Sequence, residues 1–320
     1  MDRKWGLTPS RPILAILGPT ATGKSALGIE LALKHGGEII SCDSTAVYRG
    51  FDIGTDKVPL TERRGIAHHL IDVVEPTDEY TAARYVSDTV KAIKEIYSRG
   101  RWPIIVGGTG LYYRALVRGL FPGPGADARL RARLEAIAAR RGVHFLHRML
   151  KRVDAKSALR IQPRDQKRII RALEVYFLTG KPLTDHFAAT VSPLAGYKTV
   201  AVALSPPISL VHERVARRVD AQFEQGLMDE IRRLLARGVP ETARPFGGLV
   251  YRQALEYLHG MRNETETREL ITRENRHYAR RQLIWFRKEP NLVWLPTSGE
   301  SPETVTAVET LVRMNLESRY

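Results

Sequence analysis

The sequence predicts an α/β fold, in which a parallel sheet is flanked by helices and the chain is interrupted by an all-helical, basic insertion. In the first third of the chain, short apolar runs alternate with helical patterns, as in strand–helix–strand units. Between residues 122 and 196 no strand pattern occurs, and basic residues dominate. We therefore expect a discontinuous core over residues 11–121 and 197–300, an insertion over 122–196 and a C-terminal helix in 301–320.

Apolar runs and helical spacing define the elements of the core. Strands are expected at residues 12–17, 38–41, 69–74, 102–106, 198–204 and 292–295. Helices are expected at residues 26–33, 81–98, 209–236, 273–288 and 303–314. In such a parallel sheet, ligands bind beyond the carboxyl ends of the strands.

The insertion follows a cluster of glycine and proline at residues 121–125, which breaks regular structure. Three helices are expected in it, over residues 127–141, 144–153 and 164–179. Residues 122–196 contain 15 Lys or Arg and 6 Asp or Glu, a net charge of +9. A second basic segment at 273–288 interleaves arginines with aromatic residues, which suits a nucleic acid. The alternative is a solvated basic helix whose Trp285 and Phe286 are core residues, and for these two aromatic residues we favour this alternative.

The overall composition narrows the functional class. The chain has 320 residues with 50 Lys and Arg against 35 Asp and Glu, a net charge of +15 and a pI of about 10.0. A small-metabolite enzyme does not need this excess, whereas a protein that neutralises a nucleic-acid backbone does. The single cysteine, Cys42, allows no intramolecular disulfide, and neither a membrane span nor a signal peptide is evident. We expect a cytoplasmic protein that does not enter a membrane.

The sequence Gly18-Pro19-Thr20-Ala21-Thr22-Gly23-Lys24-Ser25 fits the phosphate-binding loop pattern G-x-x-x-x-G-K-[ST]. An apolar run precedes it and a helical pattern follows it, as a P-loop-type sheet requires. In such a loop, backbone N–H groups and a helix N-terminus bind a phosphate, the lysine neutralises its charge, and the serine hydroxyl can hold Mg²⁺. The loop therefore predicts a polyphosphate ligand without identifying it.

Polar residues that follow other strands leave several functions open. Enzymes that bind ATP with this loop usually have an apolar strand ending in Asp that helps to hold Mg²⁺. Here the strand at 102–106 is followed by Gly-Gly-Thr, and Asp72 is the one good candidate for such a residue. The alternatives are a small-molecule kinase with Asp43 as base and a non-catalytic, nucleotide-gated RNA-binding protein. The basic insertion argues against the first, and Asp43 and Thr109 at strand ends argue against the second.

Further motifs follow the loop in a characteristic order along the chain. They lie at residues 43–55, 68–72, 107–112, 129–135, 165–174, 218–220, 226–227, 278–282 and 285–287. Together with the loop, this set resembles the tRNA dimethylallyltransferase (isopentenyltransferase) family over about residues 12–297.

The resemblance implies transfer of a dimethylallyl group from dimethylallyl diphosphate to the exocyclic N6 of the adenosine 3′ of the anticodon in tRNA. The loop residues 18–25 and Arg218 would bind the diphosphate. Asp43 would act as general base with Thr109 beside it, and Ser25 and Thr109 would hold Mg²⁺, the implied cofactor. The implied partners are dimethylallyl diphosphate and the tRNA anticodon arm, and we expect a monomer because the tRNA would cover much of the surface.

The resemblance also assigns contacts with tRNA to residues in several segments. These are Asp43, Ser44, Thr45, Ala46, Thr109, Arg131, Lys167, Arg168, Ile169, Ile170, Arg171, Tyr251, Arg252, Arg280, Arg281, Gln282, Trp285 and Arg287. The alternatives are that Arg131 is an ordinary surface residue, that residues 167–171 form a solvated helix face, and that Thr109 caps the following helix.

The chain departs from the family pattern in two places. Ala46 stands where the family usually has a Gln that is expected to position the target nucleotide. Val250 stands where the family usually has the Gly of an Ile-Gly-Tyr segment, and Gly247-Gly248 come just before it.

Overall fold

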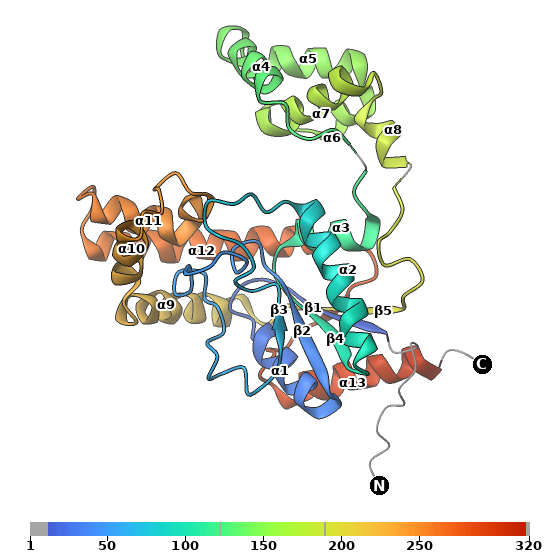
Figure 1. Cartoon of the computed structure of the whole chain (residues 1–320), viewed down its shortest axis with the longest axis vertical. Helices are drawn as coiled ribbons and strands as arrows, with labels where there is room; N and C mark the ends of the chain where they lie inside the picture. Colours follow the sequence, from blue (N-terminus) through green and yellow to red (C-terminus); the bar gives the residue numbers. More distant parts are fainter. Residues whose placement is uncertain (1–11, 122, 189, 318–320) are drawn as a thin grey trace. The chain divides into compact units, whose positions relative to one another are not determined.

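A parallel sheet with the strand order β3-β2-β4-β1-β5-β6 forms the centre of the larger of two units in the chain (Figure 1). The computed structural model describes residues 12–121, 123–188 and 190–317. The strands are β1 (Ile13–Leu17), β2 (Gly37–Cys42), β3 (His68–His69), β4 (Trp102–Gly107), β5 (Thr199–Leu204) and β6 (Val293–Leu295). β1, β2 and β4 are buried along their whole length, which explains the continuous apolar runs of β1 and β4, whereas β2 also contains Glu38 and Ser41. The predicted α/β class is confirmed.

Helices cover both faces of this sheet. α1 (Lys24–His35) and α13 (Pro302–Glu317) share an apolar cluster with one face, to which Leu14, Leu27 and Val308 contribute fully buried side chains. Burying each such side chain stabilises the fold by about 1.5–3 kcal/mol. α2 (Ala82–Ser98) also contacts β2 and β4, and its buried residues lie outside that cluster, so it covers the opposite face.

A group of helices completes this unit. They are α3 (Gly110–Arg118), whose residues 116–118 belong to the smaller unit, α9 (Ile208–Glu224), α10 (Leu227–Ala236), the 3-10 helix η1 (Arg244–Gly247), α11 (Leu249–Leu258) and α12 (Glu264–Phe286). The predicted single helix over 209–236 is wrong: Gly226 has a φ of 89° and separates α9 from α10. α12 begins before the predicted residue 273 because Asn263 and Glu266 form a capping box. α12 packs against both α9 and α11.

The strand predicted at residues 69–74 ends after His69, so that prediction is wrong. Leu70 and Asp72 have left-handed φ values of 62° and 56°, which turn the chain out of the sheet. The segment instead donates from the Asp72 and Val73 N–H groups to the carbonyls of Ala46 and Val47. Asp72 is therefore not at the end of a buried strand.

The smaller unit, residues 116–193, includes most of the segment predicted as an all-helical insertion, and residues 194–196 of that segment belong to the larger unit. Its helices are α4 (Ala128–Arg141), α5 (Val143–Val153), α6 (Ala155–Arg160), α7 (Gln166–Thr179) and α8 (Leu183–Ala188). α6 and α8, which the sequence analysis did not predict, are six residues long, too short for a clear apolar period. Leu134, Leu146, Leu150 and Leu173 form its apolar core. No helix in the described ranges is long and apolar enough to cross a membrane.

Candidate active site

The phosphate-binding loop lies between β1 and α1, as its sequence context predicts. Gly18 has a φ of 137°, and a Cβ there would lie 2.7 Å from the Leu204 carbonyl oxygen, so only glycine fits. Gly23 forms the N-cap of α1 and no side chain caps that helix. The first N–H groups of α1 are therefore available to an anion.

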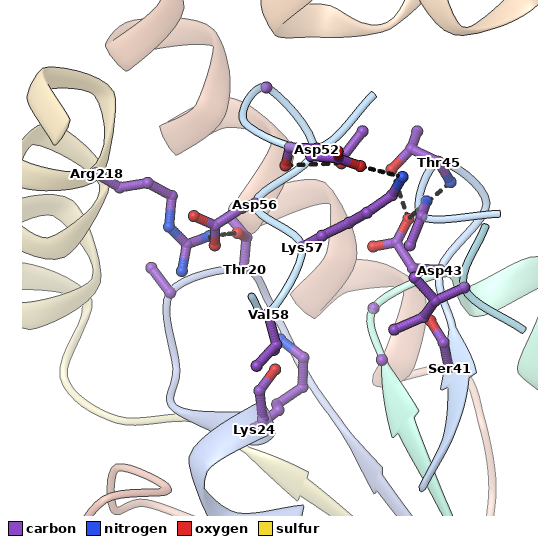
Figure 2. A pocket seen from close by; sticks show the side chains of 18 of the residues that line it. Thr20, Lys24, Ser41, Asp43, Thr45, Asp52, Asp56, Lys57, Val58 and Arg218 are labelled. Carbon is purple, nitrogen blue, oxygen red and sulfur yellow. Dashed lines mark hydrogen bonds and ion pairs between the residues drawn. The ribbon is translucent and has the colours of Figure 1, made fainter. Parts of the chain in front are cut away.

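Two cationic side chains converge on this loop (Figure 2). Lys24 donates a hydrogen bond to the Pro19 carbonyl, and Arg218 of α9 donates to Thr20 Oγ1 at 2.6 Å. Burial, together with the charge of Arg218, lowers the pKa of Lys24 to about 7, although Asp43 and Asp56 act in the opposite direction. An anion between the two cations would relieve their repulsion, which is the environment expected for a diphosphate.

Asp43 follows β2 directly and lines one cavity together with residues of the phosphate loop. Its Oδ1 accepts hydrogen bonds from Thr45 N at 2.8 Å and from Thr45 Oγ1 at 2.6 Å. Within the described residues, its Oδ2 has no hydrogen bond. One carboxylate oxygen thus fixes the orientation of the side chain, while the other remains available to accept a proton.

Thr109, which follows β4, lies beside the segment that carries Asp43. Its Oγ1 accepts a hydrogen bond from Ser44 N at 3.0 Å, and its own N–H donates to the Cys42 carbonyl at 3.0 Å. The side chain is therefore directed to the 43–45 turn, whereas a cap of α3 would require a bond to that helix. The tertiary structure brings together two residues that are far apart in the sequence because β2 and β4 are paired.

Gln282 connects the loops that follow β1 and β4. Its Oε1 accepts from Thr20 N at 2.9 Å, and its Nε2 donates to the Gly108 carbonyl at 3.0 Å. Because the side chain is buried and both ends of its amide are used, Gln282 holds the site together, and the tRNA contact expected for it is not supported. A Cβ on Gly108 would lie 2.4 Å from Gln282 Nε2, so Gly108 was the available sequence signal of this close approach.

An open cavity of about 1310 Å³ connects the phosphate loop, Asp43 and Gln282, whereas Thr109 does not line it. It is large enough for a diphosphate with an attached hydrocarbon and for part of a second substrate. It is lined by residues 20–26, 43–46 and 52–60, by Arg214, Arg217 and Arg218, by residues 248–251, and by Tyr278 and Gln282, among others.

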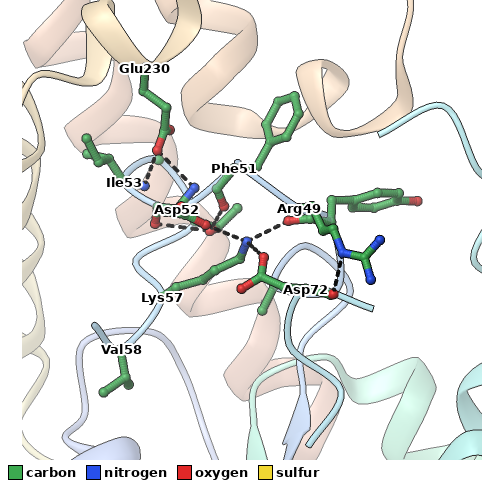
Figure 3. A network of polar contacts seen from close by, with 12 residues as sticks. Arg49, Phe51, Asp52, Ile53, Lys57, Val58, Asp72 and Glu230 are labelled. Atoms are coloured by element: carbon green, nitrogen blue, oxygen red, sulfur yellow. Dashed lines mark hydrogen bonds and ion pairs between the residues drawn. The ribbon is translucent and has the colours of Figure 1, made fainter. Parts of the chain in front are cut away.

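The segment 52–57, which lines this cavity, is held by buried groups of α10 and α11, and Figure 3 shows the contacts of Glu230 from α10. Glu230 accepts hydrogen bonds from Asp52 N at 3.0 Å and Ile53 N at 2.8 Å. Tyr251 donates its hydroxyl to Glu230 at 2.5 Å and accepts from Gly54 N at 3.0 Å. Burial, with the neighbouring Glu230 carboxylate, raises the pKa of Tyr251. The hydroxyl of Tyr251 is thus committed to this segment, contrary to the tRNA contact expected for it.

Lys57, the last residue of the same segment, binds two carboxylates. Its buried Nζ donates to the Asp52 carboxylate at 2.7 Å and to the Asp72 carboxylate at 2.6 Å. Asp72, the candidate for an Mg²⁺-holding strand end, is therefore the partner of a buried cation. The sequence analysis did not single out Lys57 or Glu230. Glu230 binds a segment that is distant in the chain, and the burial of Lys57 between Asp52 and Asp72 is not visible in the local sequence.

Exposed arginines lie on α12 and at its end. Arg280, Arg281 and Arg287 are exposed to solvent, as nucleic-acid contacts require. Phe286 is fully buried, as expected, whereas Trp285 is half-buried and stacks with Arg114 at 4.2 Å. Contacts with tRNA were also expected for Arg252 and Ala46. Arg252 is exposed but paired with Glu274 at 3.1 Å, and Ala46 is buried.

In the helical unit, the expected tRNA contacts separate into two groups. Lys167 and Arg168 are exposed, but Ile169 and Ile170 are buried in the core of the unit, so contacts of their side chains with RNA are contradicted. Their position follows from helical spacing, which places them on the inward face of α7.

Arg131 and Arg171 have a structural role in the same unit. Arg131 donates to both oxygens of the fully buried Glu174, at 2.8 and 2.9 Å, and Arg171 donates to it at 2.6 Å. Burial by itself would raise the pKa of the Glu174 carboxyl, but hydrogen bonds from the two arginines hold it below its usual value. The interpretation of Arg131 as an ordinary surface residue is therefore wrong.

A phosphate loop with two converging cations, next to a carboxylate on a parallel sheet, defines a P-loop-type α/β protein with a candidate polyphosphate site. The model of the IPP transferase family matches residues 46–289, and the chain belongs to this family.

The chain is 47% identical over 292 residues to the tRNA dimethylallyltransferase of Solibacter usitatus, covering 91% of this chain and 95% of that protein. It is similar to the crystal structure of the full-length tRNA isopentenylpyrophosphate transferase from Bacillus halodurans, with 36% identity, a TM-score of 0.71 and coverage of 97% and 98% of the two chains. It is also similar to a eukaryotic dimethylallyltransferase acting on tRNA, with 27% identity and a TM-score of 0.77 over 94% of this chain and 78% of that one.

Proposed function

We propose that this protein transfers the dimethylallyl group of dimethylallyl diphosphate to the exocyclic N6 of the adenosine 3′ of the anticodon in tRNA, and releases diphosphate. Membership of the IPP transferase family and relatives named tRNA dimethylallyltransferase support this activity. The observation that carries the proposal is the convergence of Lys24 and Arg218 on a phosphate loop that shares its cavity with Asp43.

The loop and its two cations would stabilise the leaving diphosphate. As the allylic C–O bond breaks, negative charge grows on the diphosphate, and the N–H groups at the start of α1 with Lys24 and Arg218 face that charge. These groups are in place before the reaction because the loop and Gln282 hold them, so little reorganisation is needed as the charge develops.

Oxygen donors at the site suit Mg²⁺, which prefers hard oxygen ligands. Ser25 lines the cavity at the start of α1, and its exposed hydroxyl fits such a ligand. Thr109, the second residue proposed to hold the ion, also accepts from Ser44 N, which leaves lone-pair capacity on its hydroxyl. When bound, Mg²⁺ would supply positive charge to the diphosphate oxygens.

Asp43 would act as the general base. The adenine nitrogen attacks the allylic carbon and loses a proton, which the Oδ2 atom of Asp43 would accept while Oδ1 remains bound to Thr45. Because the site is a cavity within the protein, the adenine would leave its base stack to reach it.

Exposed cations of both units would bind the RNA backbone. They are Lys167 and Arg168 on α7, and Arg280, Arg281 and Arg287 on or next to α12. The affinity for tRNA should fall steeply as the salt concentration rises, because cations that neutralise phosphates release counterions. The monomeric state and the cytoplasmic location stay predictions.

The test is transfer of label from dimethylallyl diphosphate to unmodified tRNA in the presence of Mg²⁺. The Asp43→Asn variant should bind both substrates but turn over about 10²–10⁴-fold more slowly, as for loss of a general base. Asp78→Asn, at an exposed position outside the cavity, is the matched control and should behave as the wild type. Absence of transfer by the wild type would refute the function, and transfer to a phosphate acceptor from ATP would favour a kinase.

A further inference from the structure

The carboxylate of Asp56 forms an ion pair with the guanidinium of Arg218, which in the proposed function binds the diphosphate. Asp56 Oδ2 lies 2.9 Å from Arg218 NH1, which also donates to Thr20 Oγ1 of the phosphate loop (Figure 2). Both side chains are partly exposed, at 41% for Asp56 and 31% for Arg218, so a ligand entering from the cavity can reach them.

Asp56 is presented to the site by a segment with a fixed backbone. Glu230 binds the N–H groups of Asp52 and Ile53, and the Asp56 N–H donates to the Ile53 carbonyl at 3.0 Å. Asp56 itself has a φ of 58°, in the left-handed region that few residues other than Gly, Asn and Asp adopt readily. Its position beside Arg218 thus follows from a held turn rather than from a freely moving side chain.

The ion pair has two consequences for the charges at the site. Arg218 lowers the pKa of Lys24, which shows that the two cations repel each other, and Asp56 offsets this effect. The same carboxylate would repel an incoming polyanion, because like charges in close contact oppose binding. Asp56 therefore stabilises the empty site and destabilises the site filled with diphosphate.

We propose that Asp56 is a stand-in anion that holds Arg218 against the phosphate loop while the site is empty and yields it to diphosphate on binding. This inference rests on the proposed function, since it assumes that Arg218 binds the diphosphate. Its effect is to keep Arg218 oriented between turnovers and to weaken retention of the diphosphate product, which favours release.

The experiment measures the binding of inorganic diphosphate to the full chain by titration calorimetry, with and without Mg²⁺. The Asp56→Asn variant should bind diphosphate about fivefold more tightly at low salt, consistent with loss of one partly exposed ion pair and of a repulsive charge. The difference should shrink as salt screens both effects. Product inhibition by diphosphate in the transfer assay should strengthen by a similar factor.

A matched control separates this ion pair from a general change of charge. Glu62 lines the same cavity, is exposed, and has no ion pair in the described structure, so Glu62→Gln should leave the affinity for diphosphate within about twofold of the wild type. Asn adopts the left-handed conformation readily, and Asp56→Gly provides a second variant if the first does not fold.

The possible outcomes either support or overturn the inference. Equal or weaker binding by Asp56→Asn without Mg²⁺ would overturn it, and weaker binding that appears only with Mg²⁺ would instead make Asp56 a metal ligand. Failure of the wild type to bind diphosphate at all would contradict the proposed function and not this inference alone. Tighter binding by the variant, with Glu62→Gln unchanged, would confirm it.

Discussion

Raising the pH above 7 should weaken diphosphate binding, because Lys24 must then take up a proton as the anion binds. Burial and the charge of Arg218 lower the pKa of Lys24 from 10.5 to about 7 in the empty site. A bound diphosphate favours the charged ammonium and moves this pKa upward. Below about pH 7, Lys24 is thus already charged in the empty site. Above this pH, Lys24 must be protonated when the diphosphate binds, and this protonation reduces the binding free energy.

The magnitude follows from proton linkage. Between the pKa of the free site and that of the complex, one proton is taken up per diphosphate bound, so affinity should fall about tenfold per pH unit, or about 1.4 kcal/mol. From pH 7.5 to 8.5, the Lys24 contribution to affinity should therefore decrease about tenfold.

The measurement is the dissociation constant of inorganic diphosphate from pH 6 to 9.5 in Mg²⁺-free buffers. The Lys24→Arg variant keeps its charge over this range, because the guanidinium does not deprotonate. The ratio of the wild-type to the variant dissociation constant cancels the titration of diphosphate itself. A flat ratio across this range would refute the reasoning, because it would mean that Lys24 is charged in the empty site at every pH tested.

Two further predictions concern side chains that hold the structure. Gln282→Met removes the partner of both Thr20 N and the Gly108 carbonyl, and should lower kcat/KM about tenfold or more, since each bond lost at a buried group costs about 1–3 kcal/mol. Glu174→Gln removes the charge that binds two arginines in the helical unit, and should lower the free energy of unfolding in urea by about 1–3 kcal/mol, with little effect on diphosphate binding.

Each of these variants has a matched control. Gln225 is exposed and lines the same cavity, so Gln225→Met should leave kcat/KM near the wild-type value. Glu135 is exposed on α4, so Glu135→Gln should shift the free energy of unfolding by less than about 0.5 kcal/mol. Wild-type kcat/KM in Gln282→Met, or unchanged stability in Glu174→Gln, would contradict the roles given to these residues.

Local patterns were sufficient for the main strands and for the phosphate loop. β1, β4 and β5 are apolar runs because both faces of a parallel sheet are covered, and the loop is identified by short-range spacing alone. The strand predicted after His69 failed because left-handed backbone at Leu70 and Asp72 is set by contacts with residues 46–48, which a local pattern does not contain.

Local sequence patterns predicted the fold class, the basic helical insertion and the phosphate-binding loop, together with Asp43 and Thr109 as residues at strand ends. Those features depend on spacing within a few turns or strands. Tertiary contacts were needed to show that Gln282 and Tyr251 support the site, that Arg131 and Arg171 bind a buried carboxylate, and that Asp56 pairs with Arg218. The physical reason is that each of these roles depends on a partner distant in the sequence or on burial, and neither is encoded in the local order of residues.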